Sequence, residues 1–212
     1  LYHLELSDGS VRWKYLTDNY INGAPAIWKN HAVFGGCDAK LHMVNIETGF
    51  ARKPIEIGSF IAGTVAIEKN RAYIGHYDNA FLCIELEERR ILWEYRFKAF
   101  PFFSSAAIGD DRIVFGGRDQ RLHCVNKADG RMIWRFKARG KIDSSPVICN
   151  DRVAAASNDG RVYVLSLADG SEIWSYETGG PIAGSPAVSS GKLVIGSENG
   201  MVYAFGSTRG NP

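Results

Sequence analysis

Residues 145–176 read SPVICNDRVAAASNDGRVYVLSLADGSEIWSY, and this stretch holds four short apolar segments separated by turn residues. The segments are residues 145–149, 152–156, 161–165 and 172–176. The turns between them are Asn150-Asp151, Asn158-Asp159-Gly160 and Ala168-Asp169-Gly170. Short β-compatible segments joined by Asn, Asp and Gly turns predict antiparallel strands connected by hairpins. We therefore predict one four-stranded antiparallel sheet from this stretch.

The same pattern recurs along the chain with a period of about 40 residues. One column of the repeat holds Trp13, Trp93, Trp134 and Trp174, and Lys53 stands where the next tryptophan is missing. Two further columns hold small and polar residues, namely Gly35, Gly75, Gly116, Ala156 and Gly196, and then Asp38, Asp78, Asp119, Asp159 and Asn199. A fixed period of this length indicates a repeat architecture, and four strands per repeat are typical of a β-propeller blade.

We predict an all-β protein, a β-propeller of four-stranded antiparallel blades built from about five repeats of about 40 residues. Complete blades are expected at about residues 24–57, 64–97, 105–138 and 145–177, with partial blades at 1–17 and 185–206. Residues 1–212 are expected to form a single propeller domain or a propeller segment. Two arrangements fit the pattern: a closed five-bladed propeller, or part of a seven- or eight-bladed one.

The sequence around the last tryptophan resembles the pyrroloquinoline-quinone-like (PQQ-like) repeat. The resemblance rests on Asp169-Gly170-Ser171-Glu172-Ile173-Trp174-Ser175-Tyr176, on Gly184-Ser185-Pro186-Ala187-Val188, and on Gly196-Ser197-Glu198-Asn199-Gly200 with Val202-Tyr203-Ala204. Such repeats occur in quinoprotein dehydrogenases and in the BamB-type outer-membrane assembly lipoprotein. The resemblance implies that Trp13, Trp93, Trp134 and Trp174 dock between blades, where a large flat ring fills the wedge between sheets. Lys53-Pro54 departs from this pattern, so we expect that blade to be the most irregular.

Composition excludes several classes of protein. The formal net charge is +2, which favours neither a nucleic-acid-binding nor a membrane-surface role. No uninterrupted apolar stretch approaches the roughly 18 residues that a membrane helix needs. The four cysteines, Cys37, Cys83, Cys124 and Cys149, form no CxxC pair, and most are expected to be free and buried. A periplasmic or other extracytoplasmic location is implied only by the resemblance to periplasmic relatives.

The sequence contains no HExxH, paired CxxC, phosphate-loop or GxSxG motif. His42 and His123 share a repeat column and are expected to be partly exposed rather than a ligand pair. The recurring aspartates are expected to bond the backbone of their own hairpin turns. Adjacent cysteines, found in many quinoprotein alcohol dehydrogenases, are missing. We predict no catalytic, cofactor-binding or metal-ligating residue here, and PQQ and calcium enter only if the chain belongs to a dehydrogenase.

Partner binding is predicted on the loops that join the fourth strand of one repeat to the first strand of the next. One apolar position recurs in these loops and indicates packing between blades: Ile21, Ile61, Phe102, Ile142 and Ile182. The candidate partner-binding residues are the loop aromatics Tyr20, Phe60, Phe100, Phe102 and Phe103. Aromatic side chains on loops are typical anchors of protein interfaces. The alternative is that they cap the apolar seams between blades.

The sequence therefore favours a non-catalytic PQQ-like β-propeller scaffold that mediates protein–protein interaction or complex assembly. The expected partner is a protein or a larger complex, with no nucleic acid and no direct membrane span. Two alternatives stay open. In the first, the chain is a segment of a PQQ-dependent dehydrogenase, and in the second it is a sensory or regulatory propeller of a larger protein.

Overall fold

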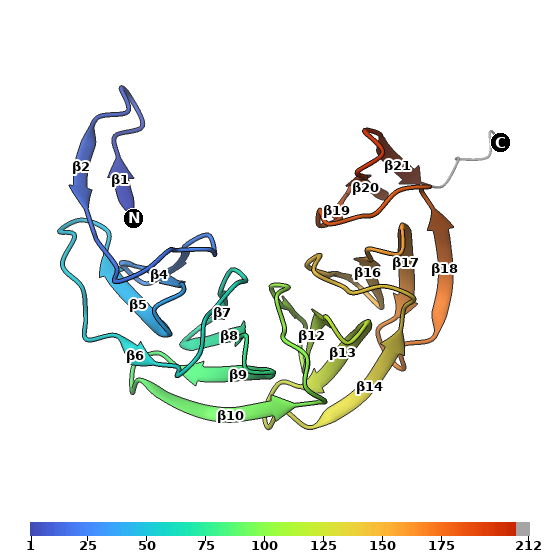
Figure 1. Ribbon diagram of the computed structural model, residues 1–212, viewed down its shortest axis with the longest axis horizontal. Helices are drawn as coiled ribbons and strands as arrows, with labels where there is room; N and C mark the ends of the chain where they lie inside the picture. The colour runs from blue at the N-terminus through green and yellow to red at the C-terminus, as the bar shows by residue number, and fades with distance from the viewer. Residues whose placement is uncertain (207–212) are drawn as a thin grey trace. The chain divides into compact units, whose positions relative to one another are not determined.

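The computed structural model describes residues 1–206, which form 21 β-strands and no α-helix. Within each sheet, strands that follow one another in the chain pair antiparallel (Figure 1). The chain divides into two compact units, Leu1–Pro101 and Phe102–Pro212. No helix able to cross a membrane occurs in residues 1–206.

The first unit holds a two-stranded hairpin and two four-stranded sheets. The hairpin pairs β1 (Tyr2–Leu4) with β2 (Val11–Lys14). One sheet contains β3 (Ala26–Trp28), β4 (His31–Gly35), β5 (Lys40–Asn45) and β6 (Ile55–Glu56), and the other contains β7 (Ala66–Glu68), β8 (Arg71–Gly75), β9 (Ala80–Glu85) and β10 (Arg90–Arg96). Strand β6 has only two residues and begins directly after Pro54, which has no N–H to donate to a ladder.

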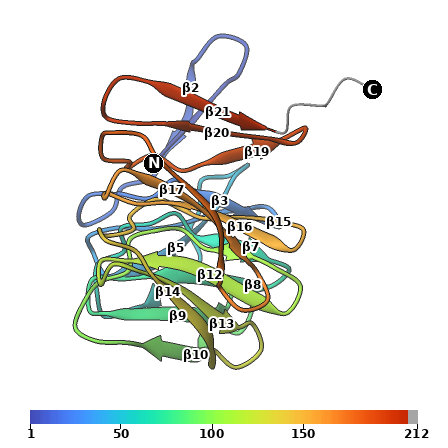
Figure 2. The same ribbon diagram turned by 90° about the vertical axis from the view of Figure 1, so that its right-hand side faces the viewer.

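The second unit holds two four-stranded sheets and one three-stranded sheet. The first contains β11 (Ala107–Ile108), β12 (Arg112–Gly117), β13 (Arg121–Asn126) and β14 (Met132–Lys137). The second contains β15 (Val147–Cys149), β16 (Arg152–Ala156), β17 (Arg161–Ser166) and β18 (Glu172–Glu177). Figure 2 shows β19 (Ala187–Ser189), β20 (Lys192–Gly196) and β21 (Val202–Gly206) side by side, with β21 at the edge.

The middle strands of the sheets form the core. In β9, Phe81, Leu82, Cys83 and Ile84 are at most 2% exposed, so both faces of this strand are covered. Burial on both faces explains why the strand reads as a continuous apolar run instead of an alternating one. Because the strands are antiparallel, the turns between the first and second and between the third and fourth strands share one end of each sheet. The loops between sheets lie at the other end, which we call the loop face of each unit.

The recurring loop isoleucines pack against the recurring glycines. A Cβ atom added to Gly35 would lie 2.4 Å from Cδ1 of Ile61, and one added to Gly116 would lie 2.4 Å from Cγ2 of Ile142. Both isoleucines are at most 1% exposed. A larger residue at either glycine would displace the loop, so this contact explains why the column needs a minimal side chain.

Hydrogen bonds between residues 40 positions apart join successive sheets at their first strands. In the second unit, the N–H of Ser105 donates to Oγ of Ser145 at 3.0 Å, and the N–H of Ser145 donates to Oγ of Ser185 at 2.9 Å. In the first unit, the N–H of Ala24 donates to Oγ1 of Thr64 at 3.1 Å. These bonds join the segments that precede the first strands of successive sheets.

Candidate protein-docking surface

Three of the loops between sheets, those that contain Ile61, Ile142 and Ile182, are held by backbone hydrogen bonds to turns on both of their sides. In the first unit, the N–H of Ile61 donates to the Gly36 carbonyl at 3.0 Å, and the N–H of Tyr77 donates to the Phe60 carbonyl at 2.9 Å. The second unit repeats the arrangement with the pairs Ile142–Gly117 at 3.1 Å and Asn158–Lys141 at 3.0 Å. These loops therefore present their side chains from a backbone that is hydrogen-bonded on both sides.

Three of the five candidate partner-binding residues are exposed on the first unit. Tyr20 is 79% exposed, and Phe60 and Phe100 are each 46% exposed. The ring of Phe60 meets the ring of Tyr77 edge to face, with centroids 6.0 Å apart. Tyr77 is 43% exposed and was missed by the sequence analysis, because it lies in the turn between β8 and β9 and not in a loop between sheets.

The other two candidates, in the second unit, are not free anchors. Phe102 is 1% exposed and packs edge to face on Phe115 and His123, with centroids 5.1 and 5.2 Å away. Phe102 occupies the loop column whose side chains pack between sheets, and its ring is therefore buried. Phe103 is half-buried under the guanidinium of Arg118, whose carbon lies 4.0 Å from the ring centroid. Nε and Nη2 of Arg118 donate to the two carboxylate oxygens of Asp143 at 3.0 Å each.

The four recurring tryptophans have different surroundings. Nε1 of Trp13 donates to the Ile46 carbonyl at 2.9 Å, and Nε1 of Trp134 donates to the Leu167 carbonyl at 2.9 Å. Both rings lie against a glycine of the neighbouring strand pair, Gly49 and Gly170 respectively. Trp93 is 8% exposed and stacks on Phe81 within its own sheet.

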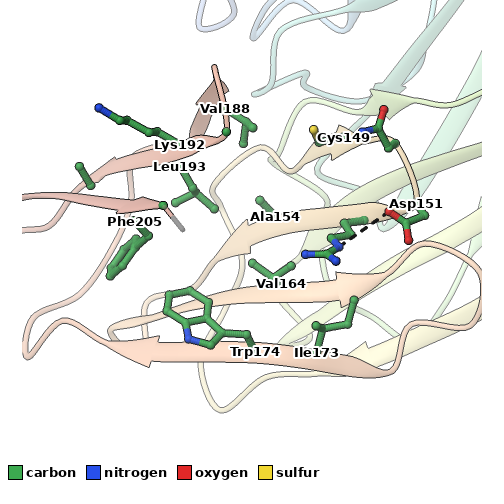
Figure 3. Close-up of a pocket in the computed structure, with 15 residues that line it drawn as sticks. Cys149, Asp151, Ala154, Val164, Ile173, Trp174, Val188, Lys192, Leu193 and Phe205 are labelled. Atoms are coloured by element: carbon green, nitrogen blue, oxygen red, sulfur yellow. Dashed lines mark ion pairs between the residues drawn. The ribbon is translucent and has the colours of Figure 1, made fainter. Parts of the chain in front are cut away.

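Trp174 is 37% exposed and lines a groove of about 680 Å³ in the second unit. Figure 3 shows the groove, with Val188, Leu193 and Phe205 on the side of the last sheet and Trp174 on β18. An ion pair between Arg152 and Asp151, 3.7 Å long, lies among the lining residues. The groove belongs to the seam between two sheets and not to the loop face.

The expectation that His42 and His123 are partly exposed is wrong. His42 is 4% exposed and His123 is fully buried. Nε2 of His42 lies 2.8 Å from Oδ2 of Asp38, and Nε2 of His123 lies 3.1 Å from Oδ1 of Asp119. Because Tyr163 bonds Asp159 in the same position at 2.7 Å, the shared role of this column is to hold a turn carboxylate.

The recurring aspartates also bond their own turns, as predicted. Oδ1 accepts from the backbone N–H two residues later in Asp38, Asp119 and Asp159, at 3.3, 3.2 and 2.9 Å. Asp78 differs, because its carboxylate forms an ion pair with Arg96 at 3.5 Å. These carboxylates therefore have structural partners on both the backbone and the side chains around them.

The two buried thiols have raised pKa values, which disfavour the reactive thiolate. All four cysteines are free, and Cys83 and Cys124 are buried. Burial raises the pKa of Cys83 to about 11 and that of Cys124 to about 12. A nucleophilic or metal-binding thiol needs the opposite shift. Within residues 1–206, no group of three or more His, Cys, Asp or Glu side chains is placed to hold a metal ion.

A family model described as outer membrane protein assembly factor BamB matches residues 98–212, which is more than half of the chain. The chain belongs to the PQQ-like repeat family of BamB. This membership confirms the resemblance seen in the sequence. Among curated proteins, no sequence matches the chain.

The crystal structure of BamB from Moraxella catarrhalis has the same fold. It superposes with a TM-score of 0.79 over 93% of this chain, at 20% sequence identity. This member of the BamB family spans 65% of that BamB chain, less than two thirds of its length. The match confirms the all-β propeller fold with four-stranded antiparallel blades. The number of blades, the blade boundaries and the single propeller domain stay predictions.

Proposed function

We propose that this chain is a non-catalytic propeller scaffold that binds protein partners during outer-membrane protein assembly, in the periplasm or another extracytoplasmic compartment. The observation that carries the proposal is the exposure of Tyr20, Phe60 and Phe100 on the first unit. Membership of the BamB family supports the choice of assembly as the process. We further propose that these residues act without a cofactor.

The chemistry of these loops suits protein binding. Tyr and Phe supply large contact areas and have few rotatable bonds, so little side-chain entropy is lost when they are buried against a partner. The Phe60–Tyr77 pair offers two edge-to-face rings beside a hydrogen-bonded backbone. An anchor that is held before binding adds affinity because less ordering is needed on association.

Photo-cross-linking tests the proposal. The photoreactive residue p-benzoylphenylalanine replaces Tyr20, Phe60 or Phe100, one at a time, in the protein exported to the periplasm of a bacterial host. Phe50 is the matched control, because it is 79% exposed but lies in the turn between β5 and β6, at the end of the sheet opposite to the loop face. We expect cross-links to outer-membrane assembly proteins from the three loop positions and none from Phe50. Equal yields from all four positions would contradict the proposal.

The dehydrogenase alternative makes a different prediction. A PQQ-dependent enzyme binds the quinone together with calcium, so titration of the purified protein with PQQ and Ca²⁺ would change the quinone absorbance. We expect no saturable change. A saturable, calcium-dependent change would favour the dehydrogenase segment over the scaffold.

A further inference from the structure

Two seams between neighbouring strand pairs are filled in the same way. Trp13 lies against Gly49, and Trp134 lies against Gly170, and each glycine follows its tryptophan by 36 residues. Both glycines have a positive φ of 74°, which places the ring over a turn that has no side chain. The rule for a filled seam is therefore a tryptophan on one side and a glycine on the other.

The seam between the two four-stranded sheets of the first unit breaks this rule on both sides. Lys53 stands in the tryptophan column, and the residue 36 positions later is Arg89. Arg89 has φ of 56°, so a long side chain occupies the left-handed conformation that the other repeats give to glycine. In place of a ring, this seam has a groove of about 400 Å³, which is lined by Lys53, Pro54, Ile55, Glu56, Glu88, Arg89 and Ile91.

Charge in this groove is unbalanced. Glu88 pairs with Arg90 at 2.5 Å, whereas the exposed Glu56 lies opposite Lys40 in the β5–β6 register, and the Lys40 ammonium pairs with Asp18 at 2.9 Å. No ion pair of Lys53 or Arg89 is recorded among the described residues, and both side chains are exposed. The groove therefore combines an apolar floor, from Pro54, Ile55 and Ile91, with the two exposed cations Lys53 and Arg89. With Glu88 paired to Arg90, these cations exceed the remaining carboxylate, Glu56, by one positive charge.

We propose that this seam groove binds an acidic polypeptide segment, which places an aromatic side chain on the apolar floor and carboxylates beside Lys53 and Arg89. The aromatic ring takes the space that Trp13 and Trp134 fill in the other seams. The carboxylates provide the charge complement that selects the partner. The inference rests on the proposed scaffold role for its choice of a polypeptide ligand, but its site is separate from the loop face. Arg89 lies in the third-to-fourth-strand turn of its sheet, at the end opposite to the loop face, and no residue that lines the groove belongs to a loop between sheets.

Calorimetric titration with three capped peptides tests this site on the whole chain. The probe is Glu-Asp-Trp-Asp-Glu, and its controls replace Trp with Ala or replace all four acidic residues with Lys. We expect the acidic Trp peptide to bind at least about tenfold more tightly than either control, and its affinity to fall with added salt. No binding of the acidic Trp peptide at about 1 mM, or equal binding of the basic peptide, would overturn the proposal.

Two variants locate the binding in the groove. Lys53→Glu is expected to weaken binding at least about tenfold, whereas Lys69→Glu, an exposed lysine of the same unit outside the groove, stays within about twofold. The double variant Lys53→Trp with Arg89→Gly restores the filled seam of the other repeats. It should fold, unfold at a higher temperature than the natural chain, and fail to bind the peptide. A folded double variant that binds as tightly as the natural chain would overturn the inference.

A third variant separates this inference from the proposed function. Replacing Tyr20, Phe60 and Phe100 together by Ser removes the exposed aromatics of the loop face and leaves the groove intact. We expect this triple variant to bind the acidic Trp peptide like the natural chain. If it loses the peptide while Lys53→Glu retains it, the peptide binds the loop face and the seam groove is not the site.

Discussion

Nε2 of His123 lies 3.1 Å from Oδ1 of Asp119, and both side chains are at most 1% exposed. Burial lowers the pKa of His123 against the opposing effect of the Asp119 carboxylate. Burial acts to raise the pKa of Asp119, but the hydrogen bond from His123 and nearby positive charge, from Arg121 and from His123 when it is protonated, lower it overall. A neutral imidazole that donates to a charged carboxylate satisfies both shifts.

Stability should fall in mild acid because of this pair. The unfolded chain protonates its histidine below the ordinary pKa of 6.5, whereas the folded chain resists protonation until a lower pH. The unfolded state therefore binds more protons, and each pH unit in that window removes at most about 1.4 kcal/mol per group. Asp119 adds a loss of the same sign, which develops only as the pH falls below its ordinary value of 3.8.

The variant His123→Tyr should reduce this acid sensitivity. Tyrosine is the residue that bonds the aspartate at the equivalent position in the Tyr163–Asp159 pair, so the hydrogen bond can be kept without a titrating ring. Urea unfolding at pH 7.5 and 5.5 measures the change. We expect the unfolding free energy of the variant to fall less between the two pH values. Some pH dependence should remain because burial also lowers the pKa of His76. Equal losses in both proteins would show that His123 does not carry the effect.

Replacing Gly170 by Ala should be costly for two reasons. Its φ of 74° is unfavourable for an L side chain, and its added Cβ would lie 2.6 Å from Cε3 of Trp134. We expect a loss of about 2–5 kcal/mol, from about 1–2 for the backbone and about 1–3 for overpacking. Gly191→Ala is the control, because Gly191 has φ of 70° and open space around the added atom. Thermal and urea unfolding should show only the backbone cost there, and equal costs would remove the packing argument.

The tryptophans of the repeat column should contribute unequally to the free energy of unfolding. Trp134 is 6% exposed and donates to the Leu167 carbonyl, so Trp134→Ala should cost about 3–5 kcal/mol. Trp174 is 37% exposed, and its ring contacts are with Tyr176 and Phe205. Trp174→Ala should therefore cost less than half as much. A similar loss of unfolding free energy in the two variants would contradict this difference.

The four thiols should separate clearly in a reactivity assay. Cys149 is exposed and Cys37 is half-buried, with Nδ2 of Asn22 2.9 Å from its Sγ. Cys83 and Cys124 are buried, and their pKa values are raised to about 11 and about 12. In the native protein at pH 8, a thiol-reactive chromogenic disulfide should modify Cys149 first and leave Cys83 and Cys124 intact until urea unfolds the chain. Fast modification of either buried thiol would show that its sheet opens locally.

The strands and turns could be predicted because each turn carries its own chemical signal. Gly160 and Gly170, for example, adopt φ of 81° and 74°, which few other residues tolerate. The repeat columns of Gly116 and of Ile142 were likewise each visible in the sequence as a periodic position. Only the structure shows that residues of the two columns touch. The repeat period thus predicts the strands and turns, because equivalent positions of the repeats adopt the same backbone conformation.

The contacts that the sequence did not reveal join different columns. Asp119 and His123 belong to one repeat but to two columns, and comparison within columns hides their hydrogen bond. Lys53 and Arg89 belong to two repeats, and only the docking of Trp13 on Gly49 shows that these positions meet. Tyr77 was missed because no other repeat has an aromatic residue at that turn. The aromatic Phe102 was predicted as a surface anchor, but its column packs between sheets.

Ser145 accepts a hydrogen bond from the backbone of Ser105 and gives one to the side chain of Ser185. Each repeat of this kind thus carries the acceptor for its predecessor and the donor for its successor. A gene duplication that copies one whole repeat would insert a unit whose two ends already match, leaving no unpaired polar group at either junction. Adding or removing whole repeats therefore keeps the hydrogen bonds of this junction. A break inside a repeat would instead leave a donor or an acceptor without its partner.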